Sequence, residues 1–348
     1  MSTFQSRKRM RLSLGVVAVS AGLLLAACGS SDDGDNGGSG GGKDAADTNI
    51  GIVIKGLDNP FFQHMEDGIN AEQKESGADI EIQAAASITD TSGQADKLTN
   101  LANQEFDCYL VNPISGTNLI QGIAQIAAKG TPIVNIDNPV EAKAADAAGA
   151  EIATYIGTDN VAAGKMVADQ LAKLDSDGGD VATVGGIAGD VTSAQRIDGF
   201  KEGLADNFEV VQEVAANWDR QEAQTQAETI LQANPDLAAF FVANDDMAMG
   251  VARAVAAADK KGKTLVVSVD GIDGVASGDI DAAVAQYPFV VGKMGLQACE
   301  AAALGEKLPE KVDTPIALIT PDNAKDAQDA FPEPPNEYDN PFAEMLGR

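Results

Sequence analysis

The chain has 348 residues, and 44% of them are hydrophobic, which is enough apolar material for one or two buried cores and favours two domains. Acidic side chains number 53 against 24 basic ones, so the formal net charge is −29. This charge repels phosphate backbones and anionic lipid headgroups, and it therefore argues against a nucleic-acid partner.

The first 28 residues have the features of a targeting segment. Basic residues at positions 7–11 precede an apolar run at 12–25, and the sequence then reads Leu-Ala-Ala-Cys, ending at Cys28. This pattern resembles the bacterial lipobox. The resemblance implies a lipoprotein signal peptide at 1–28 with Cys28 as the lipid-modified residue, and the alternative is a plain signal peptide or a retained membrane anchor.

The next segment, 29–47, is rich in Gly, Ser and Asp. Such a composition cannot bury a core, so we expect a flexible tether. No later segment is long and apolar enough to cross a bilayer. We therefore expect an extracytoplasmic protein that is anchored to the outer face of the cell membrane only by lipidated Cys28.

From residue 48 onward, short apolar runs alternate with segments of helical periodicity. Ile50–Ile54 predicts a buried strand. The Asn59-Pro60 pair then predicts a helix start, because Asn caps helices and Pro fits their first turn. The further strands expected in this half are 80–82, 108–111 and 132–136. Alternating strands and helices imply right-handed βαβ units and a parallel sheet.

A second series with the same plan follows a loop expected at 141–151. Its expected strands are 181–184, 209–213, 239–242 and 265–268, with helices that include 161–174 and 221–233. A long helix at 290–304 and a strand near 316–319 come next. From Pro332 the chain is rich in Pro and acidic residues, and we expect it to lie extended over the surface.

The cysteine and histidine content limits the chemistry. His64 is the only histidine, and the sequence has no Cys-x-x-Cys or His-Cys cluster, so a zinc site or a Ser-His-Asp hydrolase is hard to build. Cys108 and Cys299 have the surroundings of small core residues. A disulfide between them would suit an exported protein, but two cysteines carry little signal and the pairing stays open.

Polar and aromatic side chains follow the predicted strands. Ligands usually bind at the carboxyl ends of parallel strands in α/β folds. Aromatic rings suit the apolar C–H faces of a sugar ring, and Asp, Asn and Arg can each engage two neighbouring hydroxyls. The combination therefore suits a small polyhydroxylated ligand. The candidate ligand-binding residues are Lys55, Asn59, Phe61, Phe62, Asn112, Asp137, Asn138, Arg196, Trp218, Asn244, Asp270 and Gln286.

Several of these residues belong to longer motifs. The motifs are Asn59-Pro60-Phe61-Phe62, Thr158-Asp159-Asn160, Trp218-Asp219-Arg220, Asn244-Asp245-Asp246-Met247-Ala248-Met249-Gly250, Val269-Asp270-Gly271 and Ala285-Gln286. From about residue 48 to 320, their sequence and order resemble the ribose and allose branch of the periplasmic sugar-binding proteins. The resemblance implies the type I fold of that family, which is α/β with two Rossmann-like, doubly wound parallel-sheet domains joined by a three-segment hinge.

The same resemblance implies the domain limits. The crossovers are expected near Thr158, Tyr287 and Ile316. The implied parts are an N-terminal sugar-binding domain of 48–157 plus 288–315, a C-terminal sugar-binding domain of 158–287 plus 316–325, and an acidic Pro-rich tail of 326–348.

The family motifs also imply roles for the candidate residues. Phe61, Phe62 and Trp218 would sandwich a sugar ring, and the polar residues would bond its hydroxyls. Lys55 falls where the allose branch has lysine, which favours an allose-like hexose. Two positions depart from the pattern, because Asn138 replaces a charged residue and Phe62 replaces the tryptophan of the allose branch. The carboxylates and amides at strand ends also fit simple helix caps.

The function implied is capture of a ribose- or allose-like monosaccharide between two closing domains and its delivery to an ABC importer. No catalytic residue, cofactor or metal is implied, and the partners would be the sugar and the permease subunits of a monomeric protein. One alternative is a sensory receptor for a polyol, inositol or furanosyl signal that docks on a chemoreceptor or sensor kinase. A transcription repressor would need a helix-turn-helix where this chain has the lipobox, and a glycosidase would need paired catalytic carboxylates.

Overall fold

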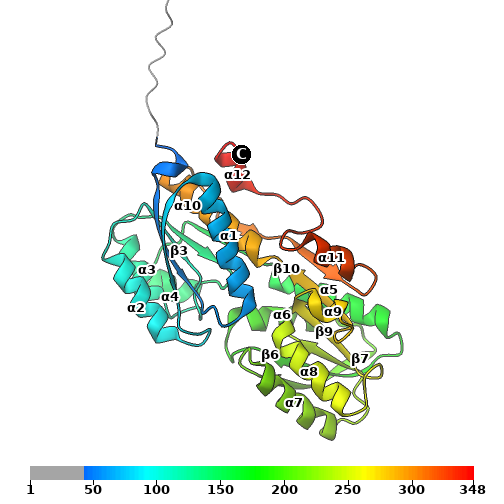
Figure 1. Ribbon diagram of the computed structural model, residues 1–348. Coiled ribbons are helices and arrows are strands. Elements are labelled where there is room, and N and C mark those ends of the chain that lie inside the picture. Colours follow the sequence, from blue (N-terminus) through cyan, green and yellow to red (C-terminus); the bar gives the residue numbers. More distant parts are fainter. Residues whose placement is uncertain (1–42) are drawn as a thin grey trace, which may run out of the picture. The chain divides into compact units, whose positions relative to one another are not determined.

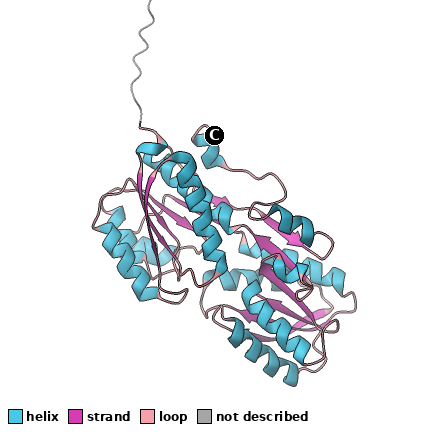
Figure 2. Ribbon diagram, in the orientation of Figure 1, coloured by secondary structure: helices cyan, strands magenta, loops and turns pink. Residues whose placement is uncertain are grey.

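Two six-stranded sheets, each flanked by helices, form two domains (Figures 1 and 2). They are seen in a computed structural model that describes residues 43–348. The expected signal peptide, Cys28 and most of the tether lie outside the described residues. The architecture agrees with the α/β fold class expected from the sequence.

The first domain has a fully parallel sheet. Its strands are β1 (Asn49–Ile54), β2 (Asp79–Ala84), β3 (Cys108–Val111), β4 (Ile133–Ile136), β5 (Thr154–Gly157) and β11 (Lys311–Asp313). Their order is β11-β5-β4-β3-β1-β2. The helices are α1 (Pro60–Ser76), α2 (Thr91–Ala102), α3 (Ile120–Ala127), α4 (Ala142–Ala148) and α10 (Pro288–Ala303), after a 3-10 turn, η1 (Ala45–Asp47). Helices cover both faces, which is why β3 and, after its first residue Asn49, β1 are buried runs of mostly apolar residues.

The second domain repeats the plan. Its strands are β6 (Gly179–Gly185), β7 (Phe208–Ala215), β8 (Ala239–Val242), β9 (Leu265–Asp270), β10 (Ala282–Gln286) and β12 (Ile316–Ile319), in the order β12-β10-β9-β8-β6-β7. Only β12 runs antiparallel among the strands of this sheet, at its edge beside β10. The helices are α5 (Asn160–Leu174), α6 (Val191–Gly203), α7 (Arg220–Ala233), α8 (Asp245–Ala257) and α9 (Asp273–Ala276).

The chain passes between the domains three times, from β5 to α5, from β10 to α10 and from β11 to β12. The first domain is therefore built from two stretches of sequence with most of the second domain between them, and β12 joins the second domain after the third crossover. Cys108 of β3 and Cys299 of α10 form a disulfide that joins these two stretches, with their Cα atoms 5.5 Å apart. The structure thus answers the pairing question that the sequence left open.

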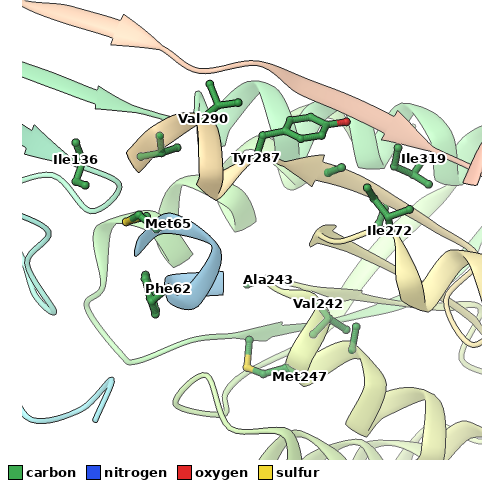
Figure 3. Close-up of a cluster of buried hydrophobic side chains, with 14 of the residues drawn as sticks. Phe62, Met65, Ile136, Val242, Ala243, Met247, Ile272, Tyr287, Val290 and Ile319 are labelled. Carbon is green, nitrogen blue, oxygen red and sulfur yellow. The ribbon is translucent and has the colours of Figure 1, made fainter. Parts of the chain in front are cut away.

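A buried apolar cluster lies beside the second crossover. Phe62 and Met65 enter it from α1, Met247 enters it from α8, and Tyr287 and Val290 enter it at the crossover itself (Figure 3). The phenyl ring of Phe62 is 8% exposed and the other four residues are fully buried. Closely packed interiors do not tolerate large displacements, so this cluster fixes the start of α1 relative to the sheets.

The structure differs from the expected secondary structure at several places before the tail. The loop expected at 141–151 contains helix α4, because Glu141 caps an alanine-rich run by accepting bonds from the backbone N–H groups of Lys143 and Ala144. Strands β5, β10 and β11 were not expected. They are short or alanine-rich, and their pairing with distant strands, rather than local propensity, makes them extended.

The tail also differs from the expected extended segment. Helix α11 (Ala324–Ala330) ends before Pro332, residues 332–340 form no helix or strand, and the chain then forms α12 (Pro341–Met345). Phe342 of α12 is fully buried, and Asn340 donates a 2.8 Å hydrogen bond to the side chain of Gln297 in α10. The tail therefore returns to the first domain and packs there, because Phe342 supplies an apolar anchor within an otherwise polar sequence.

Two features are absent from residues 43–348. No helix in this part of the chain is long and apolar enough to span a membrane. The same residues contain no cluster of three or more His, Cys, Asp or Glu side chains that could hold a metal ion.

Candidate functional site

A cavity lies between the two domains, at the carboxyl ends of the strands of both sheets. Loops after β1, β2, β3 and β4 line it from the first domain, and loops after β6, β7, β8 and β9 line it from the second. Parallel strands bring these loops together although they are far apart in sequence. The lining residues are Lys55, Asn59, Phe61, Phe62, Ile88, Ile114, Asp137, Ile187, Asp190, Thr192, Arg196, Trp218, Asn244 and Asp270.

In the first domain, an ion pair and two aromatic rings face the cavity. The ammonium of Lys55 lies 3.0 Å from Oδ2 of Asp137 and 5.0 Å from the ring centre of Phe62. The rings of Phe61 and Phe62 meet edge to face at 5.2 Å. Oδ2 of Asp137 is buried and makes no hydrogen bond of good geometry within residues 43–348. This oxygen therefore keeps the capacity to accept a hydrogen bond from a ligand hydroxyl.

In the second domain, Arg196 is fixed by its neighbours. Its Nε donates to Asn160 at 2.8 Å, and its Nη1 donates to the carbonyl of Ala243 at 2.7 Å and to Asp270 at 3.1 Å. The guanidinium also lies 5.8 Å from the ring centre of Trp218. Among the described residues Nη2 has no hydrogen-bond partner, so this nitrogen is available to a ligand. A guanidinium held in one orientation can select a ligand by the positions of its hydroxyls.

Asp270 combines burial with neighbouring charge. Burial raises the pKa of Asp270 to about 6, and the Arg196 guanidinium and the Gln286 amide oppose that rise. Gln286 donates to Asp270 and accepts a bond from Thr158, so it holds the carboxylate in place from behind.

Three residues of the cavity have positive φ angles without being glycine. They are Asp137 with φ of 62°, Trp218 with φ of 61° and Asp270 with φ of 121°. Each stands at the end of a strand and lines the cavity. Non-glycine residues adopt this region at a cost, and such residues gather at ligand-binding sites. The positive φ angles therefore occur at residues whose side chains line the cavity.

A family model described as a periplasmic binding protein domain matches residues 50–307. The chain belongs to this family. It is 38% identical over 253 residues to a D-allose-binding periplasmic protein of Escherichia coli, covering 71% of this chain and 81% of that protein. It is 29% identical over 315 residues to the ribose import binding protein RbsB of Bacillus subtilis, covering 89% of this chain and 99% of that one.

Solved structures with a similar fold support the same family assignment. A solute-binding protein of Actinobacillus succinogenes with bound D-allose matches with a TM-score of 0.75 and 28% identity over 80% of this chain and 99% of that one. Another, from Agrobacterium vitis with α-D-tagatopyranose bound, also has a TM-score of 0.75 and 28% identity, over 81% and 97% of the chains. Members of the periplasmic binding protein family are solute-binding proteins of transporters and not enzymes, as expected.

In this periplasmic binding protein, nine of the twelve sequence-predicted residues line the cavity and three do not. Asn112 is fully buried, and its amide nitrogen contacts the sulfur of Met65. Asn138 bonds to both domains beside the cavity. Gln286 lies behind Asp270. Asn138 and Gln286 therefore bond to residues of the cavity wall, whereas the buried Oδ1 of Asn112 has no hydrogen-bond partner among residues 43–348.

Five lining residues were missed by sequence reasoning. Ile88, Ile114 and Ile187 are apolar, so they do not stand out in a search for polar and aromatic groups. Asp190 and Thr192 lie at the start of α6, where a carboxylate is typical of a helix cap. Asp190 does cap α6, and the Gly-rich turn before it was the signal that another loop reaches the cavity.

Proposed function

We propose that this protein is a lipid-anchored, extracytoplasmic solute-binding protein that captures an allose- or ribose-like monosaccharide and delivers it to an ABC importer. The observation that supports the proposal is the cavity between the domains. Three aromatic rings, two cations and three carboxylates surround one small space. Rings for the C–H faces and charged groups for the hydroxyls are what a sugar requires.

The charges of the cavity favour a neutral ligand. Lys55 and Arg196 are each close to a carboxylate, Asp137 and Asp270 respectively, and Asp190 is a further acid. A phosphate or a sugar acid would meet no excess of positive charge there. Lys55 reaches into the cavity, which supports an allose-like hexose as the ligand that we place first.

Binding would proceed by closure of two domains about the three crossovers. A sugar that touches both domains has more contacts in the closed form, and it shifts the equilibrium toward that form by this difference in affinity. The closed form is then the one that the permease recognises. We assign the domain limits as expected from the sequence, 48–157 plus 288–315 and 158–287 plus 316–325, and a monomeric state.

The disulfide supports the extracytoplasmic location, because buried disulfides such as Cys108–Cys299 persist in oxidising compartments. The anchor is proposed on Cys28. In an expression host that processes lipoproteins, we expect the full chain to partition into detergent and to incorporate labelled fatty acid. The Cys28→Ala variant should do neither, and detergent partitioning of that variant would contradict the anchor.

The central test is sugar binding by residues 43–348, measured by calorimetry with D-allose, D-ribose, other pentoses and hexoses, and inositols. The variant Asp137→Asn keeps the shape of the side chain and, like Asp, Asn tolerates a positive φ. Loss of a hydrogen bond to a charged group costs about 1.5–3 kcal/mol, so we expect affinity to fall about 10- to 150-fold.

The matched control is Asp259→Asn, at an exposed aspartate that also has a positive φ, 57°, but lies outside the cavity. Its affinity should equal that of the wild type. Wild-type affinity in Asp137→Asn would contradict the site. Binding of an inositol but of no sugar would contradict the monosaccharide proposal and favour a receptor for a polyol signal.

A further inference from the structure

Asn138 is held firmly by the first domain. It follows Asp137 after β4 and is fully buried. Its amide nitrogen donates to the carbonyls of Pro113 at 3.2 Å and of Ile114 at 3.1 Å. The backbone carbonyl of Asn138 accepts a 3.0 Å hydrogen bond from the side-chain amide of Asn135. The loop is thus fixed to its neighbours, and the side chain has one orientation.

The same amide reaches the second domain. Its nitrogen lies 3.4 Å from Oδ2 of Asp190, and its oxygen accepts a 3.1 Å hydrogen bond from the hydroxyl of Thr192. The nitrogen faces only acceptors, two carbonyls and a carboxylate, so the assignment of nitrogen and oxygen follows from chemistry. Because one NH₂ group serves three acceptors, the bond from Thr192 is the stronger of the two links between the domains.

Asp190 and Thr192, the two residues that contact the Asn138 amide, lie at the start of α6 in the second domain. Asp190 caps α6 by accepting a 2.9 Å bond from the N–H of Ser193. Asp190 is 8% exposed and Thr192 is 7% exposed. Both line the cavity, whereas Asn138 does not. None of the three lies on a crossover, so their bonds join the domains only while the domains are together.

We propose that Asn138, Asp190 and Thr192 form a clasp that holds the closed form and sets sugar affinity without choosing among sugars. This inference rests on the proposed function. Opening of the domains would break the bonds and expose the groups to water. The clasp therefore stabilises the closed form whichever sugar is bound. Asn138, which sequence motifs suggest as a ligand contact, acts as a positioning residue.

The clasp predicts a particular pattern of affinities. A residue that touches the sugar changes the ranking of sugars when it is mutated, because sugars differ in their hydroxyls. A residue that acts on closure multiplies every dissociation constant by the same factor, since all ligands share one closing equilibrium. Two ordinary hydrogen bonds correspond to a factor of about 5 to 150.

The test uses Thr192→Val, Asn138→Ala and the double variant, with D-allose and D-ribose as probes in calorimetry. We expect each single variant to weaken both sugars by one common factor of about 3 to 30. The double variant should be about as weak as Asn138→Ala, because both changes break the same contact. The control is Thr183→Val, a fully buried threonine of β6 away from the clasp, and it should bind as the wild type does.

Small-angle X-ray scattering of the sugar-free proteins gives a readout that does not depend on the ligand. The clasp variants should have a larger radius of gyration than the wild type, because the closed form is less populated. If neither sugar binds the wild type, the proposed function is wrong. The radius of gyration of the sugar-free variants, compared with that of the wild type, then still tests the clasp. Loss confined to one sugar would make Thr192 a sugar contact and overturn the clasp, as would unchanged affinities together with unchanged scattering.

Discussion

The disulfide gives a prediction whose size follows from the topology. Cys108 and Cys299 are 191 positions apart, and both are fully buried in the first domain. The loop that they close contains all of the second domain except β12. A cross-link that closes so long a loop strongly restricts the unfolded chain, and the chain-entropy model gives about 5 kcal/mol for it. Measured values are usually lower, so we expect a loss of about 2–4 kcal/mol when the bond is absent.

The measurement is urea unfolding of residues 43–348, oxidised and after complete reduction in the unfolded state, followed by refolding in reductant. The reduced protein should unfold at lower urea. Its unfolding curve should also be steeper per unit of urea, because an unfolded chain without the cross-link exposes more surface. Sugar affinity should stay unchanged, since neither cysteine lines the cavity.

The control is the double variant Cys108→Ala/Cys299→Ala. It should have the stability of the reduced protein, less a smaller cost for the two lost sulfurs, and should not respond to reductant. Coincident unfolding curves for the oxidised and reduced wild type would refute the reasoning. They would mean either that the disulfide does not form or that the unfolded state is already compact enough for the cross-link to add nothing.

Two further predictions concern Glu72 and Glu300, a buried pair of carboxylates that Arg348 of the tail contacts. Burial, with a contribution from Glu72, raises the pKa of Glu300 to about 7. This pKa in the folded protein exceeds the value near 4.5 in the unfolded chain, so protonation of Glu300 favours the folded state. Its contribution to the free energy of unfolding is complete below about pH 4.5 and is lost as the pH rises through 7. Urea unfolding at pH 5 and pH 8 should therefore show a fall of up to about 3 kcal/mol from this group, absent in Glu300→Gln; an equal fall in that variant would exclude Glu300 as the cause. Arg348 pairs with both carboxylates, and Arg348→Ala should cost about 2 kcal/mol at pH 8, whereas the exposed Lys325–Asp329 pair, tested by Lys325→Ala, should cost at most about 0.5 kcal/mol. Equal losses in both variants would contradict the buried pair.

The secondary structure could be predicted where local signals decide it. The Asn59-Pro60 pair caps and starts α1 as expected, with the Asn59 side chain accepting a 2.9 Å bond from the N–H of Phe61. The same cannot be said of β10, whose sequence Ala-Ala-Val-Ala-Gln has no strand propensity of its own. It is extended because β9 and β12 bond to it on both sides. Non-local pairing of this kind leaves little local signal in the sequence.

The tail shows the same limit. Its composition is that of a surface segment, yet Phe342 is fully buried in an apolar cluster against which Tyr338 and Met345 also pack. A single aromatic anchor contributes about 3 kcal/mol, which is enough to hold a short segment in place. Composition averages over such a residue, so a prediction from composition misses it.

The polar residues that line the cavity differ in their hydrogen bonds from those that lie behind it. Asn59 and Asn244 both cap helices through their side-chain oxygens, and among residues 43–348 neither amide nitrogen has a hydrogen-bond partner. Asn138 and Gln286 use both ends of their amides on protein groups.

Both side chains line the cavity, so each of these amide nitrogens is available to donate a hydrogen bond to a ligand there. The capping interpretation and the ligand-binding interpretation of Asn59 and Asn244 are therefore compatible, because the oxygen caps the helix and the nitrogen stays available to a ligand. Sequence alone identifies the amide at the strand end. Which of its two ends is already satisfied depends on residues far away in the chain, and only the folded structure brings those residues into view.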